Sequence, residues 1–127
     1  MKIEHIALFF DDLEGAKAFF IKYFDASANA LYENPREGFR SYFLTFDSGA
    51  RLEIMAKTGI GNADRDRETT GYSHLAFSLG AAEQVDALTE RLRRDGYRII
   101  REPRTTGDGY YESCVVDLEG NRIELTV

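Results

Sequence analysis

The sequence predicts an α+β protein built from two consecutive βαβββ modules. The first observation is that a strand-like segment occurs twice, at residues 1–10 and again at residues 72–79. Each copy contains one of the chain's two histidines, His5 and His74. Repeats of this kind must be recognised before a fold is assigned, and the two copies are 69 residues apart.

A second alternating segment is also duplicated, and each copy contains a glutamate. Glu53 lies in residues 50–55 and follows the first histidine by 48 residues; Glu124 lies in residues 121–127 and follows the second by 50. Successive side chains of a strand point to opposite faces, so the aliphatic neighbours take one face and the glutamate takes the other. The same alternation separates each histidine from the apolar side of its strand. We therefore expect two histidines and two glutamates on matching faces of two related sheets.

The remaining elements of the first half complete one module. Asp11 and Asp12 offer a helix N-cap, and apolar residues recur at helical spacing as far as Phe24. A strand is expected over 26–33, ended by Asn34-Pro35, and another over 39–46. The expected core stripe of the helix is Leu13, Ala16, Phe20, Tyr23 and Phe24.

The second half repeats this order. A helix is expected over 81–95, with Gly96 after its last turn. Strands are expected over 97–102, stopped by Pro103, and over 110–116. The expected core stripe of this helix is Val85, Leu88 and Leu92.

The repeat defines the domain organisation. We expect a single domain over 1–127, with module one at about 1–56, a linker at about 57–71 and module two at about 72–127. The linker is polar and contains a charged run at 64–68 of alternating sign, which is typical of a solvated surface.

Composition excludes several classes of function. A net charge of −6 argues against nucleic-acid binding, which depends on clustered lysine and arginine. No stretch approaches the length of a membrane span, and Glu4 and His5 interrupt the apolar start in a way that argues against a signal peptide.

The single cysteine, Cys114, is expected to be a small buried residue of a strand rather than a reactive thiol. The cytoplasm is the expected compartment.

Imidazole and carboxylate together form a ligand set for divalent metals. Two glutamates and two neutral histidines suit one ion of Zn, Ni or Co, with Mn or Fe as further options. Two remaining coordination positions would accept two adjacent oxygens of a small-molecule substrate, polarise its carbonyl and favour loss of the neighbouring proton. Strand parity places Arg51 beside Glu53 and Arg122 beside Glu124, so salt bridges without a metal stay open as the alternative.

Several motifs resemble the vicinal oxygen chelate superfamily, which includes glyoxalase I, bleomycin-resistance proteins and extradiol dioxygenases. They are the opening I-E-H-I-A, the central Y-S-H-L-A-F and the closing D-L-E-G-N-R-I-E-L, in which Leu118 replaces the family's usual proline. The stretch E-P-R-x-T-G-D-G-Y-Y-E-S is similar to a group of small bacterial glyoxalase-like proteins. The resemblance covers the whole chain and implies curved, mixed sheets that form a metal cleft.

The resemblance also implies a function and its residues. The order His5, Glu53, His74, Glu124 is similar to the metal ligands of bacterial glyoxalase I, which converts the hemithioacetal of methylglyoxal and glutathione into a thioester. By position, Glu124 is the first choice of general base and Glu53 the second. The family further implies a homodimer. Whether the site forms within one chain or between two chains stays open at this point.

Other residues are candidates for holding the substrate. Anions could be bound by four basic residues, although exposed basic residues more often only solubilise a protein: Arg36, Arg40, Lys57 and Arg104. Three tyrosines could wall the cleft, although core packing is the stronger expectation: Tyr42, Tyr110 and Tyr111.

Two competing functions remain. If Glu53 is not a ligand, His5, His74 and Glu124 form a two-histidine, one-carboxylate set that suits an Fe(II) dioxygenase or a metal-assisted thiol transferase. A protein of bleomycin-resistance type would instead bind a small molecule without chemistry. Metal analysis separates these functions.

Overall fold

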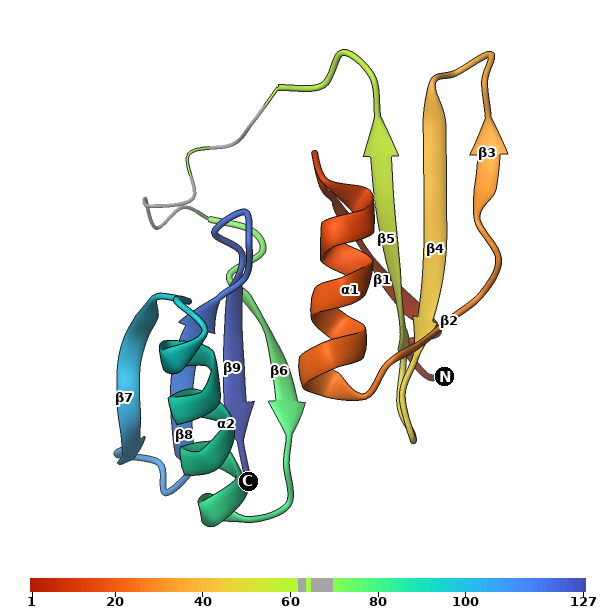
Figure 1. The fold of residues 1–127 in the computed structure, drawn as a ribbon. Coiled ribbons are helices and arrows are strands. Elements are labelled where there is room, and N and C mark those ends of the chain that lie inside the picture. The colour runs from red at the N-terminus through yellow and green to blue at the C-terminus, as the bar shows by residue number, and fades with distance from the viewer. Residues whose placement is uncertain (62–63, 65–69) are drawn as a thin grey trace. The chain divides into compact units, whose positions relative to one another are not determined.

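The computed structural model describes residues 1–61, 64 and 70–127, which form two compact units, Met1–Ala63 and Asp64–Val127 (Figure 1). The charged run predicted at 64–68 lies, except for Asp64, outside the described residues. Neither helix in the described part of the chain has the length and apolar character that a membrane crossing requires.

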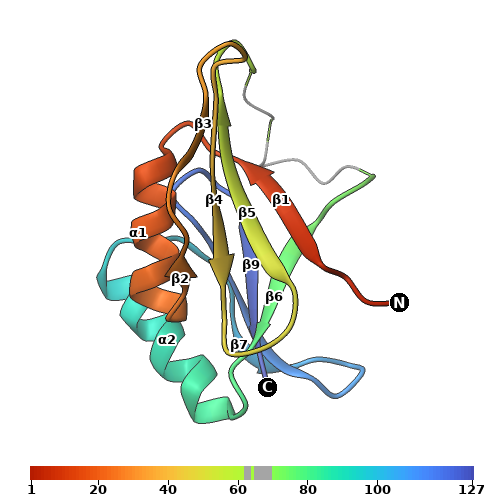
Figure 2. The same cartoon turned by 90° about the vertical axis from the view of Figure 1, so that its right-hand side faces the viewer.

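The first unit contains one helix and a mixed sheet. Its elements are β1 (His5–Phe9), α1 (Leu13–Phe24), β2 (Ser27–Ala28), β3 (Tyr32–Asn34), β4 (Phe39–Thr45) and β5 (Arg51–Lys57). The strand order is β1-β5-β4-β2, with β3 also paired to β4. Strand β1 runs parallel to β5, and the other pairs are antiparallel. Helix α1 contacts β2, β4 and β5, and Figure 2 shows it along one face of this sheet.

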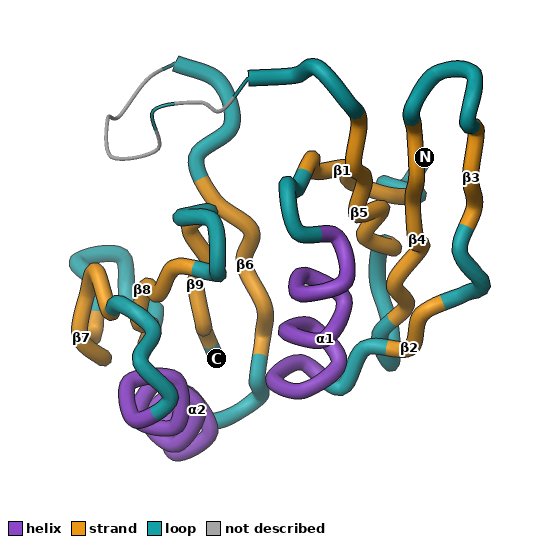
Figure 3. The backbone as a smooth tube through the Cα atoms, turned by 45° about the horizontal axis from the view of Figure 1, so that its top comes forward, coloured by secondary structure: helices purple, strands orange, loops and turns teal. Residues whose placement is uncertain are grey.

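The second unit has the same plan. Its elements are β6 (His74–Ser78), α2 (Ala82–Arg94), β7 (Ile99–Thr105), β8 (Tyr111–Val116) and β9 (Arg122–Thr126). The strand order is β6-β9-β8-β7, with β6 parallel to β9. Helix α2 contacts β7, β8 and β9, and Figure 3 shows one helix in each unit. The predicted α+β fold of two βαβββ modules is confirmed.

Both helices begin and end as their sequences predict. The Asp12 side chain accepts a hydrogen bond from the backbone N–H of Gly15 at 2.9 Å and caps α1. Gly96 follows α2 with a φ of 92°, a left-handed conformation that glycine adopts without steric cost. Each helix buries most of its predicted apolar stripe against its own sheet: Phe20, Val85 and Leu92 are fully buried, whereas Phe24 and Leu88 are half-buried.

Two strand predictions were wrong. The strand expected over 26–33 is two short strands, β2 and β3, separated by residues 29–31 and both paired with β4. Pro103 does not stop the other strand, because β7 continues through it to Thr105. Strand β7 is the outermost strand of its sheet, and its register with β8 shifts on both sides of Arg101. An edge strand with bulges tolerates a proline that a central strand would reject.

Candidate functional site

In the first unit, His5 and Glu53 lie on the face of the sheet opposite α1. The parallel pairing of β1 and β5 sets Ala7 directly beside Glu53, one strand away. The Nε2 atom of His5 lies 3.9 Å from Oε2 of Glu53. The carboxylate side chain is 16% exposed and the imidazole is 40% exposed, so the acid is mostly buried and the ring is partly open to solvent.

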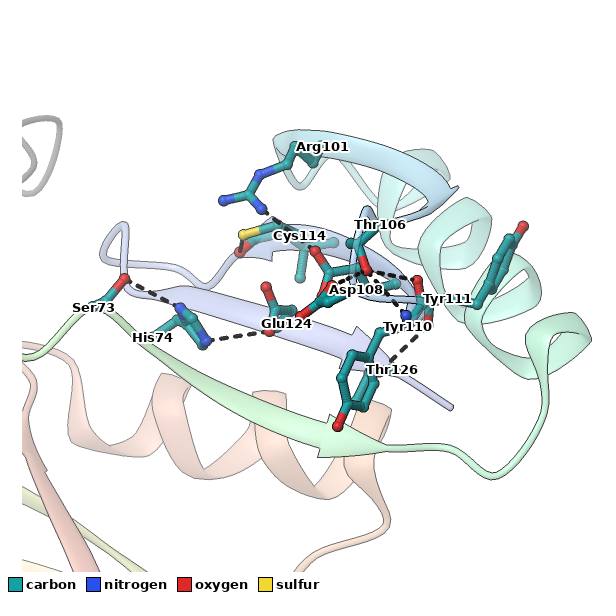
Figure 4. A network of polar contacts seen from close by, with 12 residues as sticks. Ser73, His74, Arg101, Thr106, Asp108, Tyr110, Tyr111, Cys114, Glu124 and Thr126 are labelled. Atoms are coloured by element: carbon teal, nitrogen blue, oxygen red, sulfur yellow. Dashed lines mark hydrogen bonds and ion pairs between the residues drawn. The ribbon is translucent and has the colours of Figure 1, made fainter.

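In the second unit, His74 and Glu124 repeat this arrangement. Strand β6 pairs with β9 so that Ala76 lies beside Glu124. The Nε2 atom of His74 lies 3.2 Å from Oε2 of Glu124, and Figure 4 shows the ring directed at the carboxylate. The glutamate side chain is 14% exposed. The histidines and glutamates therefore occupy equivalent register positions in two separate sheets.

The cause is the same local pattern in both units. Leu52 and Ile54 are buried on the helix side of β5, and Ile123 and Leu125 are buried in β9, so alternation turns the glutamate between each pair to the opposite face. An alanine beside each glutamate leaves room on this face. The predicted orientation of both glutamates is confirmed.

The structure brings the predicted site residues together as two pairs. Within the described residues, no group of three or more histidine, cysteine, aspartate or glutamate side chains that could hold a metal ion is found. Each unit thus contains one His–Glu pair, His5 with Glu53 or His74 with Glu124, and we call each pair a half-site.

The two half-sites differ in the residue that faces the glutamate from the next strand. Phe43 of β4 pairs with Glu53, and Cys114 of β8 pairs with Glu124. The Phe43 ring meets the His5 imidazole edge to face, with centroids 5.4 Å apart. The first half-site therefore has an aromatic wall, whereas the second has a thiol.

Cys114 is buried, with 2% exposure, as its sequence context predicts. Loss of solvation on burial is the main cause that raises the pKa of this thiol. A thiol with a raised pKa carries little thiolate at neutral pH and is a poor nucleophile. Burial and the raised pKa both support the expectation of a small buried residue rather than a reactive thiol.

The Nδ1 atom of each histidine is bound by the preceding residue. Oε2 of Glu4 lies 2.5 Å from Nδ1 of His5, and Oγ of Ser73 lies 3.1 Å from Nδ1 of His74. The hydrogen bond with His5, followed by the contacts with Arg51, lowers the pKa of Glu4. Both imidazoles thus present Nε2 to the glutamates.

The Arg51 side chain pairs with Glu4. Its guanidinium binds Glu4, with Nε 2.8 Å from Oε1, and stacks over the Phe43 ring at 4.2 Å. Alternation along the strand placed Arg51 on the face of Glu53. It could not identify Glu4 as the partner of Arg51, because Glu4 precedes β1, outside the regular strand to which alternation applies.

The basic candidates lie in different places. Lys57 is on the same face of β5 as Glu53, whereas Arg40 stands opposite Ala56 on the helix side. Arg36 lies in the turn between β3 and β4, and Arg104 pairs with Glu112 of β8. Sequence patterns gave no indication of Arg101. In the structure it lies beside Cys114 in the register of β7 and β8, and its Nη1 atom is 3.4 Å from Oε1 of Glu112 (Figure 4).

The three candidate tyrosines have different surroundings. Tyr42 is 7% exposed, and its hydroxyl donates to Glu14 of α1 at 2.7 Å. Tyr111 donates to Asp86 of α2 at 2.7 Å, a contact that raises the pKa of this tyrosine, and Tyr110 is largely exposed before β8. The core-packing expectation holds for Tyr42, and Tyr111 faces the helix.

The donor set fits a divalent metal ion. Each half-site offers the Nε2 atom of an imidazole whose Nδ1 atom already has a partner. This arrangement is common among metal-binding histidines. Each also offers a mostly buried carboxylate oxygen that lies 3.9 Å or 3.2 Å from Nε2 of that histidine. Nitrogen and oxygen donors of this kind suit first-row transition metals.

Comparison with known proteins identifies the family. Residues 2–125 match the model of the glyoxalase/bleomycin resistance protein/dioxygenase superfamily, so the chain belongs to this superfamily. It is also 29% identical over 126 residues to a Bacillus subtilis (strain 168) protein called "Uncharacterized protein YqjT", covering 97% of this chain and 96% of that protein.

Solved structures of the superfamily share the fold. A glyoxylase/bleomycin resistance protein/dioxygenase domain from Frankia sp. EAN1pec aligns with a TM-score of 0.84 and 18% identity, over 100% of this chain and 97% of that one. Glyoxalase I from Zea mays aligns with a TM-score of 0.80 and 22% identity. The chain covers 44% of the maize protein, which aligns to 98% of this chain.

Proposed function

We propose that the chain is a divalent-metal-dependent lyase or isomerase of glyoxalase type. It would act on a small molecule with two adjacent oxygens by removing the proton next to a chelated carbonyl. The observation that supports the proposal is the repetition of one His–Glu geometry, with Nε2 to carboxylate distances of 3.9 Å and 3.2 Å, at equivalent positions of both units. We further propose that the chain acts as a single domain, as a homodimer, in the cytoplasm.

Each half-site would supply two ligands to one ion. His5 and His74 would bind through Nε2, and Glu53 and Glu124 through a carboxylate oxygen. A bound Zn, Ni or Co ion supplies Lewis-acid polarisation of the substrate carbonyl. The Ala7 and Ala76 side chains leave space beside the carboxylates for the substrate.

The protein's own part in the reaction is proton transfer. A glutamate carboxylate would take the proton from the hydroxyl-bearing carbon beside the carbonyl and return it to the former carbonyl carbon. The hydroxyl proton would pass to the former carbonyl oxygen, so the net change is an isomerisation. Glu124 is the first choice of base and Glu53 the second. Both are held in the middle of a strand and shielded from bulk water, which keeps their oxygens in place.

The first experiment measures metal binding by the apoprotein. Removal of one ligand of four is expected to weaken binding at least about 100-fold. Structural zinc sites bind with about 10–16 kcal/mol, so one ligand in four accounts for about 2.5–4 kcal/mol, and about 1.4 kcal/mol is a factor of ten. The variants are His5→Ala, Glu53→Gln, His74→Ala and Glu124→Gln, each studied with Zn, Ni, Co, Mn and Fe(II). The matched control is Glu33→Gln, an exposed residue of β3.

A second experiment asks whether the half-sites pair within a chain or between chains. His5→Ala and His74→Ala chains are co-expressed in equal amounts. If the first unit of one chain pairs with the second unit of its partner, mixed dimers regain one intact site, or about a quarter of the wild-type sites. Pairing within a chain regains none.

Three results would contradict the proposal. Failure of the wild type to retain any divalent ion would favour a small-molecule binding protein. Retention of iron with oxygen-dependent turnover would favour a dioxygenase. Unchanged affinity in Glu53→Gln, with losses in the other three variants, would favour the two-histidine, one-carboxylate set.

A further inference from the structure

Glu4 makes a set of contacts that joins the start of the chain to β5. Its backbone oxygen accepts a hydrogen bond from the backbone N–H of Arg51 at 3.0 Å. Its Oε1 accepts one from Nε of Arg51 at 2.8 Å, and Nη2 of the same arginine also reaches Oε1. Main chain and side chain are thus fixed by one partner, so the carboxylate has a defined position.

That position is at the unused edge of the His5 ring. Oε2 of Glu4 lies 2.5 Å from Nδ1, while Nε2 on the other side lies 3.9 Å from Glu53. The Phe43 ring contacts the imidazole edge to face and also carries the Arg51 guanidinium over its own face. Glu4, Phe43 and Arg51 therefore form a cradle that fixes the ring.

A neutral imidazole carries one N–H, and its position decides which nitrogen can bind a metal. A carboxylate at Nδ1 accepts that hydrogen and leaves the Nε2 lone pair free. Such partners typically change metal affinity about 10–100-fold. We infer that Glu4 is a positioning residue: Arg51 holds its carboxylate, which keeps the Nδ1–H form of His5 and directs Nε2 toward Glu53. The effect of Glu4 on metal affinity rests on the proposed function.

In the second unit, the position before the histidine holds a hydroxyl instead of a carboxylate. The residue before His74 is Ser73, whose Oγ lies 3.1 Å from Nδ1. A hydroxyl is neutral and both donates and accepts, so it selects one ring form less strongly than a carboxylate does. The two half-sites are thus expected to differ: the first depends on its preceding residue more than the second.

The first test uses the apoprotein and needs no metal. The chain has two histidines, one in each unit, so ¹H–¹⁵N spectra of the rings report on each half-site separately. The wild type is expected to show His5 with its proton on Nδ1. Glu4→Ala is expected to move part of the population to the Nε2–H form and to leave His74 unchanged. The control, Glu37→Ala, removes an exposed carboxylate from the turn between β3 and β4.

The second test measures Co(II) affinity by competition with a chelator. Glu4→Ala is expected to weaken binding about 10–100-fold and Glu4→Gln less, because an amide oxygen still accepts the Nδ1–H bond without a negative charge. Ser73→Ala is expected to lose less than about tenfold, and Glu37→Ala nothing. Glu4 precedes β1 and its side chain is 56% exposed, so these changes leave the core intact.

The outcomes separate the two claims. If the wild type binds Co(II) and Glu4→Ala binds it equally well, the positioning role is refuted while the metal site stands. If the wild type binds no metal, the proposed function fails, and the ring spectra still decide the role of Glu4. An unchanged His5 spectrum in Glu4→Ala overturns the inference in either case.

Discussion

Replacing Asp117 by alanine would loosen the turn that delivers β9, the strand that contains Glu124. Asp117 is 5% exposed. Its Oδ1 accepts hydrogen bonds from the backbone N–H groups of Glu119 and Asn121, both at 2.9 Å, and its Oδ2 accepts one from Nδ2 of Asn121 at 2.7 Å. One carboxylate thus closes the loop between β8 and β9.

The cost follows from these three bonds. A protein hydrogen bond contributes about 1 kcal/mol net, and a buried donor left without a partner costs about 1–3 kcal/mol. Asn121 is 7% exposed, so its two donors are poorly placed to reach water. We expect Asp117→Ala to lower the free energy of unfolding by about 3 kcal/mol. With a urea m-value of about 1–3 kcal/mol per molar, the midpoint falls by about 1–3 M.

Urea unfolding followed by the ring resonances of the two histidines is the assay. His74 reports the unit that contains Asp117, and His5 reports the other. The matched control is Asp47→Ala, an exposed residue in the corresponding turn before β5, expected to change stability by less than about 0.5 kcal/mol. Equal midpoints for the two variants would refute the reasoning.

The dependence on pH gives a further check. Burial raises the pKa of Asp117 above its ordinary value of 3.8, and the hydrogen bonds from Asn121 and Glu119 oppose this shift only in part. A carboxyl whose pKa is raised by folding contributes most stability below its unfolded pKa and loses it as the pH rises through the folded pKa. The difference in unfolding free energy between wild type and Asp117→Ala is therefore expected to be larger near pH 3.8 than near neutral pH.

Three other perturbations test the rest of the description. Thr89→Val removes a buried hydroxyl whose Oγ1 lies 2.6 Å from Oγ of Ser113, and is expected to lower the free energy of unfolding in urea by about 1–3 kcal/mol. The double variant with Ser113→Ala should lose less stability than the sum of the two single variants, and strict additivity would contradict the pairing. Tyr42→Phe should lower stability by about 1 kcal/mol and leave metal affinity unchanged, since the hydroxyl bonds side chains of α1; a tenfold loss of affinity would place it in the site instead. Cys114 should resist iodoacetamide in the native protein and react after unfolding, and rapid native alkylation would show that the thiol is accessible.

Much of the fold was predictable because it depends on local patterns. Alternation in the two histidine strands and the two glutamate strands fixed which side chains face the helices, since a one-residue slip would bury the glutamates and expose Ile54 and Ile123. The N-cap at Asp12 and the glycine after α2 have equally local causes. The errors at residues 29–31 and Pro103 arose where edge-strand pairing, rather than propensity, decides the structure.

The amino-acid sequence by itself determined the repeat, the α+β class and the four candidate ligands, because each is a matter of spacing and side-chain alternation along the chain. Tertiary structure alone decided which partners surround them. The register of β4 on β5 sets Phe43 beside Glu53, and the approach of Glu4 to Arg51 takes that arginine away from Glu53. Contacts between residues 47 positions apart depend on how strands pair in space, which no local pattern encodes.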